Sequence, residues 1–190
     1  MEQIVKEIVE GSDNFNVRCT YAENNGLKLI GMGSARSVYK LSGSRVLKLP
    51  RDEKGIAQNK AEGRISARDS VLAKVLEFSQ DGSWLVMEQA KEVKGTAGFE
   101  KASGLSWVSF TRTIAKMWND LKNGRVVEFR GVPAPLILSV YSLMKNQGIP
   151  PGEFMTIEHW GTTKTGKLVF IDYGTDREVA KQFYPHIPVI

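Results

Sequence analysis

Two short strand-like runs separated by a tight turn constrain the fold of this chain more than any other feature. The stretch 29–49 reads LIGMGSARSVYKLSGSRVLKL, and within it 37–41 and 45–49 read as strands. The Ser-Gly-Ser between them is a turn signal, and Pro50 stops the second run. Because side chains alternate along a strand, Lys48 shares a face with Val46. An inward-facing lysine beside a glycine loop needs an anionic partner.

The glycines ahead of this hairpin allow two interpretations. Gly31 and Gly33 stand before the first strand, as they would at an ordinary hairpin entrance. They are equally typical of a phosphate-binding loop, because glycine lets the backbone approach a phosphate and point N–H groups at its oxygens. In that second interpretation Ser34 and Arg36 would add side-chain contacts, Arg36 as a charged donor.

Periodicity and turn residues place the other elements. We expect helices over residues 1–10, 56–69, 107–121 and 132–148. We expect further strands at 27–31, 71–79, 83–90 and 168–171. Residues 91–104 are rich in Gly, Lys and small residues and read as a linker or a lobe boundary. This order predicts an α+β chain with lobes at 1–90 and 91–190, the second ending in a hairpin.

The composition is that of a folded globular chain, with 42% hydrophobic and 25% charged residues among 190. A net charge of +5 favours acidic partners in principle. The basic residues are scattered, however, and form no block and no run interleaved with aromatic residues. We interpret the charge as a solvated surface and expect no nucleic-acid partner.

The start of the chain and its cysteine bear on localisation. MEQIVKEIVEG holds three glutamates and no long apolar core, unlike a secretory signal. The apolar runs are too short to span a bilayer, so we expect no membrane partner. Cys19 is the single cysteine and cannot form an intramolecular disulfide, which fits a reducing compartment. We therefore expect a cytoplasmic protein.

Three motifs in the first half follow one another in the order that protein kinases use. Residues 31–38 match GxGxxGxV, except that Arg36 stands at the third glycine. Residues 45–48, RVLK, resemble the VAIK strand with its lysine. Glu62 follows Lys48 by 14 residues (62 − 48), on the predicted helix, where kinases carry the glutamate that pairs with this lysine. Glu53 is a less favoured alternative, because it falls before the predicted helix.

Two further motifs extend the match. Residues 85–88, LVME, resemble the strand that leads to the hinge, and 167–174, KLVFIDYG, end in an Asp-aromatic-Gly similar to DFG. Residues 27–175 thus resemble the protein-kinase-like superfamily, in a reduced form similar to small kinase-like proteins of bacteriophages. The resemblance implies a miniature two-lobed fold, with an antiparallel-sheet N-lobe carrying one helix and a truncated, mainly helical C-lobe. Only 16 residues follow Gly174 (190 − 174), so we expect no activation segment.

The resemblance also implies ATP and magnesium as cofactors. Lys48 would pair with the nucleotide phosphates and with Glu62, and Asp172 would ligate magnesium, which prefers oxygen ligands. The adenine would be read by the backbone of the hinge. The implied cofactor-binding residues are Gly31, Gly33, Ser34, Arg36, Val38, Lys48, Glu62, Met87, Glu88 and Ala90.

The catalytic loop departs from the family pattern. His159 stands 13 residues before Asp172 (172 − 159), where kinases carry a metal-binding asparagine. It is a candidate metal ligand or phosphate contact, or else a packed histidine. The position of the catalytic aspartate falls on Phe154, and a shift of one residue puts Glu153 there. We take Glu153 as the candidate base, so the candidate catalytic residues are Lys48, Glu153 and Asp172.

Two functions stay open. The first is a miniature Ser/Thr-type protein phosphotransferase using Mg-ATP, in which catalysis is mostly positioning and charge neutralisation. The second is a pseudokinase-type protein that holds a partner protein without phosphotransfer. Lys48, Glu62 and Asp172 favour the first function, and Phe154 and His159 favour the second. Both imply ATP and a protein as partners, and the sequence makes no prediction of the oligomeric state.

Overall fold

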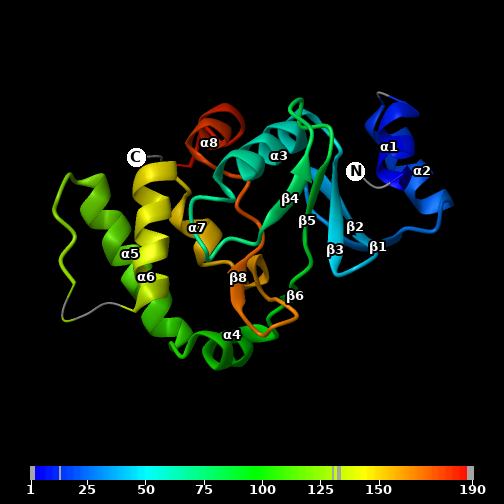
Figure 1. Cartoon of the computed structure of the whole chain (residues 1–190). Coiled ribbons are helices and arrows are strands. Elements are labelled where there is room, and N and C mark those ends of the chain that lie inside the picture. Colours follow the sequence, from blue (N-terminus) through cyan, green and yellow to red (C-terminus); the bar gives the residue numbers. More distant parts are fainter. Residues whose placement is uncertain (1–2, 13, 130, 132–133, 188–190) are drawn as a thin grey trace. The chain divides into compact units, whose positions relative to one another are not determined.

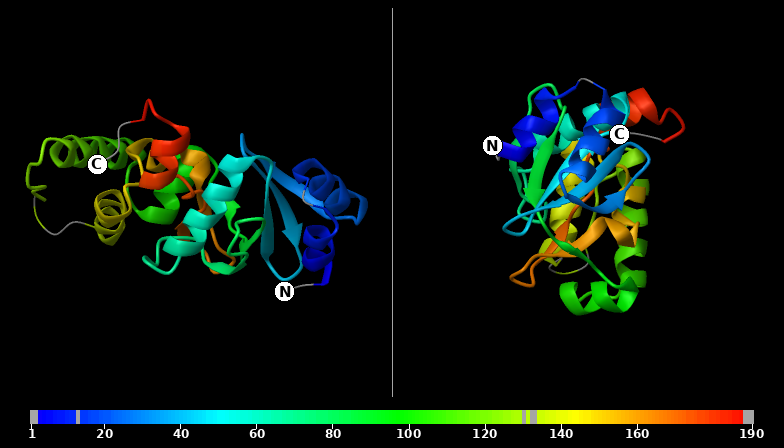
Figure 2. Two further views of the ribbon diagram at one scale, coloured as in Figure 1. Left: turned by 90° about the horizontal axis from the view of Figure 1, so that it is seen from above. Right: turned by 90° about the vertical axis from the view of Figure 1, so that its right-hand side faces the viewer.

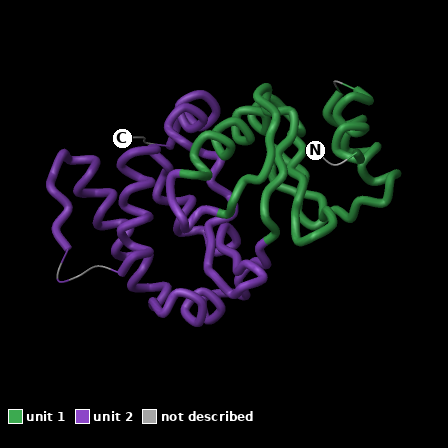
Figure 3. The backbone as a smooth tube through the Cα atoms, in the orientation of Figure 1, with its two compact units in different colours: residues 1–67, 73–89 green, residues 68–72, 90–190 purple. Residues whose placement is uncertain are grey.

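The computed structural model describes residues 3–12, 14–129, 131 and 134–187. They form two compact units (Figure 3). Unit 1 comprises residues 1–67 and 73–89, and unit 2 comprises 68–72 and 90–190. The chain therefore passes from one unit to the other after residues 67, 72 and 89. Figure 1 labels the helices and strands.

Unit 1 is built on an antiparallel sheet with the strand order β1-β2-β3-β5-β4. The strands are β1 (Lys28–Met32), β2 (Arg36–Leu41), β3 (Arg45–Pro50), β4 (Val75–Phe78) and β5 (Leu85–Glu88). The predicted hairpin is confirmed, because β2 and β3 pair with Val38 opposite Lys48. Gly43 and Ser44 reverse the chain with φ angles of 66° and 59°, a left-handed conformation that glycine adopts at no steric cost.

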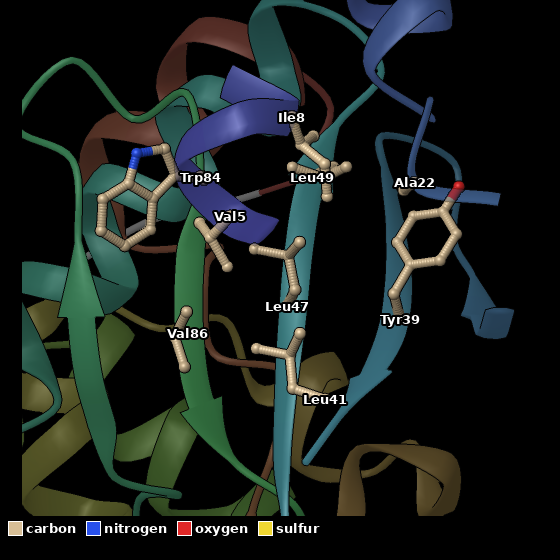
Figure 4. Packing of buried hydrophobic residues seen from close by; sticks show 9 residues of the cluster. All are labelled: Val5, Ile8, Ala22, Tyr39, Leu41, Leu47, Leu49, Trp84 and Val86. Carbon is tan, nitrogen blue, oxygen red and sulfur yellow. The ribbon is translucent and has the colours of Figure 1, made fainter. Parts of the chain in front are cut away.

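Helices lie on both faces of this sheet (Figure 2). α1 (Gln3–Glu10) and α2 (Phe15–Asn24) lie on one side, and α3 (Glu53–Ile65) lies on the other. The core under α1 and α2 is mainly apolar (Figure 4) and contains Val5, Ile8, Ala22, Tyr39, Leu41, Leu47, Leu49, Trp84 and Val86. Leu47 and Leu49 thus face α1 and α2, while Lys48 faces α3, as strand alternation predicts.

Side-chain caps set two helix starts in unit 1. α2 was not predicted, because its apolar residues follow no helical period. The side chain of Asn14 accepts hydrogen bonds from N–H groups of the first turn of α2 at 2.9 and 3.3 Å. Asp52 caps α3 by accepting from the N–H of Gly55 at 2.8 Å. α3 therefore begins three residues earlier than predicted, at 53 rather than 56, and it ends at 65 rather than 69. Each cap satisfies a backbone donor that the first helical turn leaves open.

Unit 2 is mainly helical around a small antiparallel sheet. Its helices are α4 (Gly95–Ser103), α5 (Trp107–Lys122), α6 (Pro135–Ser142), α7 (Pro151–Phe154) and α8 (Arg177–Phe183). A π-helical turn (Leu143–Gln147) extends α6, and a 3-10 turn (Ile157–His159) follows α7. The sheet has the order β6-β7-β8, with β6 (Lys91–Glu92), β7 (Trp160–Thr162) and β8 (Leu168–Phe170). The β7–β8 pair confirms the predicted final hairpin, and the start of the helix predicted at 132 lies outside the described residues.

Of the two interpretations of residues 91–104, the linker was wrong, because this segment forms β6 and α4. The physical reason is Phe99, which is fully buried and packs against Trp107 and Phe110 at 4.8 Å and against Trp160 at 5.5 Å between ring centroids. One aromatic anchor outweighs the glycines and lysines around it. The chain passes from unit 1 to unit 2 just before this segment, after residue 89.

The C-terminal helix α8 was also not predicted. Asp176 begins it by accepting hydrogen bonds from the N–H groups of Glu178 and Val179, both at 3.0 Å. Within the described ranges, we find no helix with the length and apolarity needed to cross a membrane. The chain is α+β as predicted, with sheet and helices in unit 1 and mostly helices in unit 2.

Candidate functional site

A buried ion pair marks the α3 face of the unit 1 sheet. Lys48 on β3 donates to both carboxylate oxygens of Glu62 on α3, each at 2.9 Å. Lys48 is 5% exposed and Glu62 is 0% exposed. Removing two charges from water carries a large desolvation penalty, which can cancel the attraction between them. Stabilisation of the fold alone therefore does not explain a buried pair of this kind. The structure thus brings together the lysine and the glutamate that the sequence analysis paired.

Arg36 is a second cation on the same carboxylate. Its Nη2 donates to Oε1 of Glu62 at 3.0 Å, and its Nη1 donates to Oδ1 of Asn59 at 3.3 Å. The resemblance suggested a phosphate contact for Arg36. Instead, the structure places its guanidinium, 5% exposed, against α3.

Asn59 is a residue that the sequence analysis did not single out. It is fully buried, and its Nδ2 donates to the carbonyl oxygens of Gly82 at 3.0 Å and of Lys48 at 3.4 Å. Its side chain therefore joins α3, β3 and the turn before β5. An asparagine that is buried within a helix needs hydrogen-bond partners of this kind. Nothing in the predicted helix, however, indicated that the face carrying Asn59 would be buried. Arg36, Lys48, Asn59 and Glu62 are called the Glu62 cluster below.

The glycine turn between β1 and β2 is tied to the start of α3. Gly33 N–H donates to Arg36 O at 2.9 Å, which closes a tight turn. Arg51 N–H donates to Ala35 O at 2.7 Å, and the Arg51 side chain donates to Gly33 O at 3.3 Å. Lys54 Nζ donates to Ser34 Oγ at 3.2 Å. The hydroxyl proposed as a phosphate contact thus lies beside a lysine.

Packing within the described chain does not explain Gly31, near the end of β1, or Gly33, in the turn. A Cβ on Gly31 would lie 3.7 Å from Val38, and one on Gly33 would lie 3.8 Å from Arg36 O, which are ordinary contacts. Neither glycine has a left-handed φ. Gly55 differs, because its Cβ would lie 2.3 Å from Ala35 O.

Strand register places the other predicted nucleotide contacts of unit 1. Val38 lies opposite Lys48, and Met87 lies opposite Val46, so all four share the α3 face of the sheet. Glu88 follows Met87, and its carboxylate accepts the N–H of Lys74 at 2.7 Å.

The β7–β8 hairpin of unit 2 brings three predicted site residues together. The backbone N–H of Ile171 donates to His159 O at 2.8 Å, so His159 and Asp172 flank the same end of the hairpin. His159 Nδ1 lies 3.1 Å from Oε2 of Glu153 and 3.1 Å from its carbonyl oxygen, and Nε2 lies 3.8 Å from Oδ2 of Asp172. Ala90, the last implied hinge residue, also belongs to unit 2.

The aromatic core of unit 2 separates the roles of Phe154 and Glu153. Phe154 is fully buried and stacks on Phe170 with 4.7 Å between ring centroids. Trp160 Nε1 donates to Phe154 O at 2.9 Å. This leaves the neighbouring Glu153, with a side chain 18% exposed, to face His159. A Phe in the expected place of an aspartate is therefore a core residue.

His159 lies between two carboxylates. Burial lowers the pKa of His159, but the hydrogen bond to Glu153 and the negative charges of Asp172 and Glu153 outweigh burial and raise the pKa above the ordinary value of histidine. The protonated ring would donate to both carboxylates. Metal binding requires a neutral imidazole, so the two carboxylates compete with a metal ion for this side chain.

A dedicated metal cage is not formed by the described residues, among which no group of three or more His, Cys, Asp or Glu side chains has an arrangement that could hold a metal ion. Asp172 has a side chain that is 45% exposed. One carboxylate of this kind is compatible with magnesium, because magnesium in nucleotide sites keeps several waters and takes its other ligands from phosphates.

Comparisons with known proteins return structural matches only. No protein-family model matches the sequence, and no curated protein matches it. A choline/ethanolamine kinase family protein from Mesorhizobium loti is similar at a TM-score of 0.43 and 14% identity, over 92% of this chain and 66% of that protein. The streptomycin-ATP-APH(2")-IIa ternary complex is similar at a TM-score of 0.40 and 11% identity, over 93% of this chain and 71% of the other. At these low scores we take no function from either protein.

Proposed function

We propose that this chain is a kinase-like phosphotransferase that binds Mg-ATP, with residues 1–90 as its N-lobe and 91–190 as its C-lobe. The observation that carries the proposal is the buried contact of Lys48 with Glu62 at 2.9 Å. A lysine in this position presents a fixed ammonium group to an anion on the α3 face of the sheet. Lys48 would bind the nucleotide phosphates, oriented by Glu62.

The glycine turn supports the same proposal. Neither backbone conformation nor a neighbouring atom of the described chain requires glycine at 31 or 33. Close approach of a ligand to the backbone gives a reason for both. Val38 and Met87, on the same face as Lys48, would contact the nucleoside, and the backbone from Glu88 to Ala90 would read the adenine.

Asp172 is the residue that we assign to magnesium. Its carboxylate is a hard oxygen ligand and is accessible at 45% exposure. When bound, the ion would neutralise charge on the phosphates. Glu153 would accept the proton of the acceptor hydroxyl, which we propose to be a serine or threonine of a protein, once His159 has moved or lost its proton.

A pseudokinase-type binding protein is the second candidate, and His159 favours it. Its ring lies 3.1 Å from Glu153 and 3.8 Å from Asp172, so both candidate catalytic carboxylates are engaged by one side chain with a raised pKa. A protein that keeps this arrangement would hold a partner protein and transfer no phosphate.

Thermal shift with and without Mg-ATP tests nucleotide binding. A ligand at about 100 times its Kd stabilises by about 2.7 kcal/mol, which raises Tm by roughly 5–10 °C for a chain of this size. We expect this shift in the wild type and in Lys40→Met, an exposed lysine of the same sheet, and its loss in Lys48→Met. No shift in the wild type, or an equal shift in Lys48→Met, would refute the proposal.

Transfer of radiolabelled phosphate from ATP to a protein acceptor separates the two candidates. Transfer that is lost in Asp172→Asn and Glu153→Gln, but retained in the exposed neighbour Glu158→Gln, supports the phosphotransferase. Clear Mg-ATP binding without transfer supports the pseudokinase. Transfer that survives in Asp172→Asn points to a contaminating kinase.

A further inference from the structure

We infer that Arg36 is a positioning residue, which holds the contact between Lys48 and Glu62 in place before any nucleotide binds. The inference rests on the proposed function, because it gives Arg36 a role at the proposed phosphate-binding lysine. At this position the kinase glycine-rich pattern has its third glycine, so the arginine removes backbone freedom and adds a charge.

Strand geometry explains how two cations reach one carboxylate. Arg36 lies opposite Pro50, and Val38 lies opposite Lys48. Residues two apart on a strand share a face, so Arg36 and Lys48 project from neighbouring strands to the same side of the sheet. Oε1 of Glu62 accepts from Lys48 Nζ at 2.9 Å and from Arg36 Nη2 at 3.0 Å, and Oε2 accepts from Lys48 Nζ at 2.9 Å.

The guanidinium of Arg36 is itself fixed. Its Nη1 donates to Asn59, and Asn59 donates to the carbonyl of Lys48 at 3.4 Å. Arg36 is also the residue that closes the glycine turn, through its carbonyl and the N–H of Gly33. One residue therefore links the turn, β3 and α3, which makes the orientation of Glu62 a property of the fold.

Redundancy at Glu62 follows from these contacts. When Lys48 is replaced by Met, Glu62 keeps Arg36, and when Arg36 is replaced by Met, Glu62 keeps Lys48. When both are replaced, the fully buried carboxylate loses both of these cations. Removing the partner of a buried charge is strongly destabilising, so the double variant must lose more stability than the two single variants together.

A double-mutant cycle in Tm tests this redundancy, measured without nucleotide on Arg36→Met, Lys48→Met and the double variant. We expect the double variant to melt on the order of 10 °C below the sum of the single effects. Arg36→Lys, which keeps a cation, serves as the conservative control. In the Lys48→Met background it should recover most of the Tm that Arg36→Met loses. Additive effects would overturn the inference.

Affinity for Mg-ATP, measured by calorimetry, separates positioning from a merely structural role. We expect Arg36→Met to raise the Kd about tenfold, which corresponds to one lost charged hydrogen bond acting through Lys48, and Arg36→Lys to restore it. An unchanged Kd in Arg36→Met would overturn the positioning role. A raised Kd with additive Tm effects would mean that Arg36 contacts the phosphates directly, and would overturn the inference as well.

The binding measurement and the double-mutant cycle in Tm test the proposed function and the role of Arg36 separately. If the wild type binds no Mg-ATP but the Tm effects are coupled, the proposed function and the positioning of nucleotide are refuted, while the shared pairing of Glu62 stands. If the wild type binds Mg-ATP and the Tm effects are additive, the proposed function stands and the role of Arg36 is refuted.

Discussion

The replacement Glu62→Gln offers the most direct test of the electrostatics described for unit 1. It keeps the size and shape of the side chain and removes the negative charge between Lys48 and Arg36. Both cations are 5% exposed and lie 2.9 to 3.0 Å from the carboxylate. They cannot regain water without moving α3 away from the sheet.

The magnitude follows from these distances. Coulomb's law at an effective dielectric constant of about 20 gives a gross attraction of about 5–6 kcal/mol for each contact near 2.9 Å. Part of this attraction offsets the desolvation of the charges, and breaking a buried pair typically costs about 3–5 kcal/mol net. For a chain of this size, that loss lowers Tm by roughly 6–20 °C.

Glu53→Gln is the matched control. Glu53 lies in the first turn of the same helix and is exposed, so the loss of its charge removes only a helix-dipole interaction of about 0.3–1 kcal/mol. Urea unfolding and thermal melts of both variants, without nucleotide, make the comparison. If Glu62→Gln loses no more stability than Glu53→Gln, the Glu62 cluster does not hold α3 on the sheet, and the reasoning fails.

Three other perturbations have defined outcomes. Gly55→Ala should lower the free energy of unfolding by about 1–3 kcal/mol in urea, because its Cβ would lie 2.3 Å from Ala35 O. Gly98→Ala is the control and should be neutral or stabilising, because its Cβ meets nothing closer than 3.5 Å. Equal losses of stability in the two variants would contradict this account. Because the pKa of His159 is raised in the folded state, its protonation stabilises the fold fully below the unfolded pKa of about 6.5, and this contribution is lost as pH rises through the folded pKa. The free energy of unfolding should therefore decline from pH 6 to pH 8 in the wild type and not in His159→Gln. A parallel decline in both proteins would show that another group titrates. Phe154→Asp should lose at least about 3–5 kcal/mol by emptying the stacked position on Phe170, and a well-folded variant with faster phosphotransfer would show that 154 is the catalytic position after all.

The hairpin was predictable from the sequence because its local signals agree. Alternation, the Ser-Gly-Ser turn and Pro50 all favour one register, and that register fixes the face of Lys48. The distance of 14 residues to Glu62 then needed only a helix between them to become a contact. α2 and α8 were missed because their apolar pattern gave too weak a signal, although asparagine and aspartate caps begin them.

Arg36 shows where sequence reasoning stops at the site. From the sequence, an arginine in a glycine loop reads as a phosphate contact, because arginine is a common phosphate donor. The direction of the Arg36 side chain depends on which face of β2 it occupies and on Asn59, a buried asparagine of α3 that accepts from its guanidinium. Both are consequences of tertiary packing. Likewise, Phe154 and Glu153 are neighbours in the sequence, and only the aromatic core of unit 2 decides which of them turns inward.

The path of the chain between the two units has a consequence for dissecting the protein. Residues 68–72 belong to unit 2 although they lie between two segments of unit 1. Val71 O accepts the N–H of Phe170 at 2.7 Å, and Leu72 forms a β-bridge with the same residue. A fragment cut at residue 90 would therefore leave Phe170, beside the Asp-Tyr-Gly segment, without this backbone partner. Any expression of the second unit alone must carry 68–72 by circular permutation or as an added peptide, and complementation by that peptide would measure how much this segment contributes to the folding of unit 2.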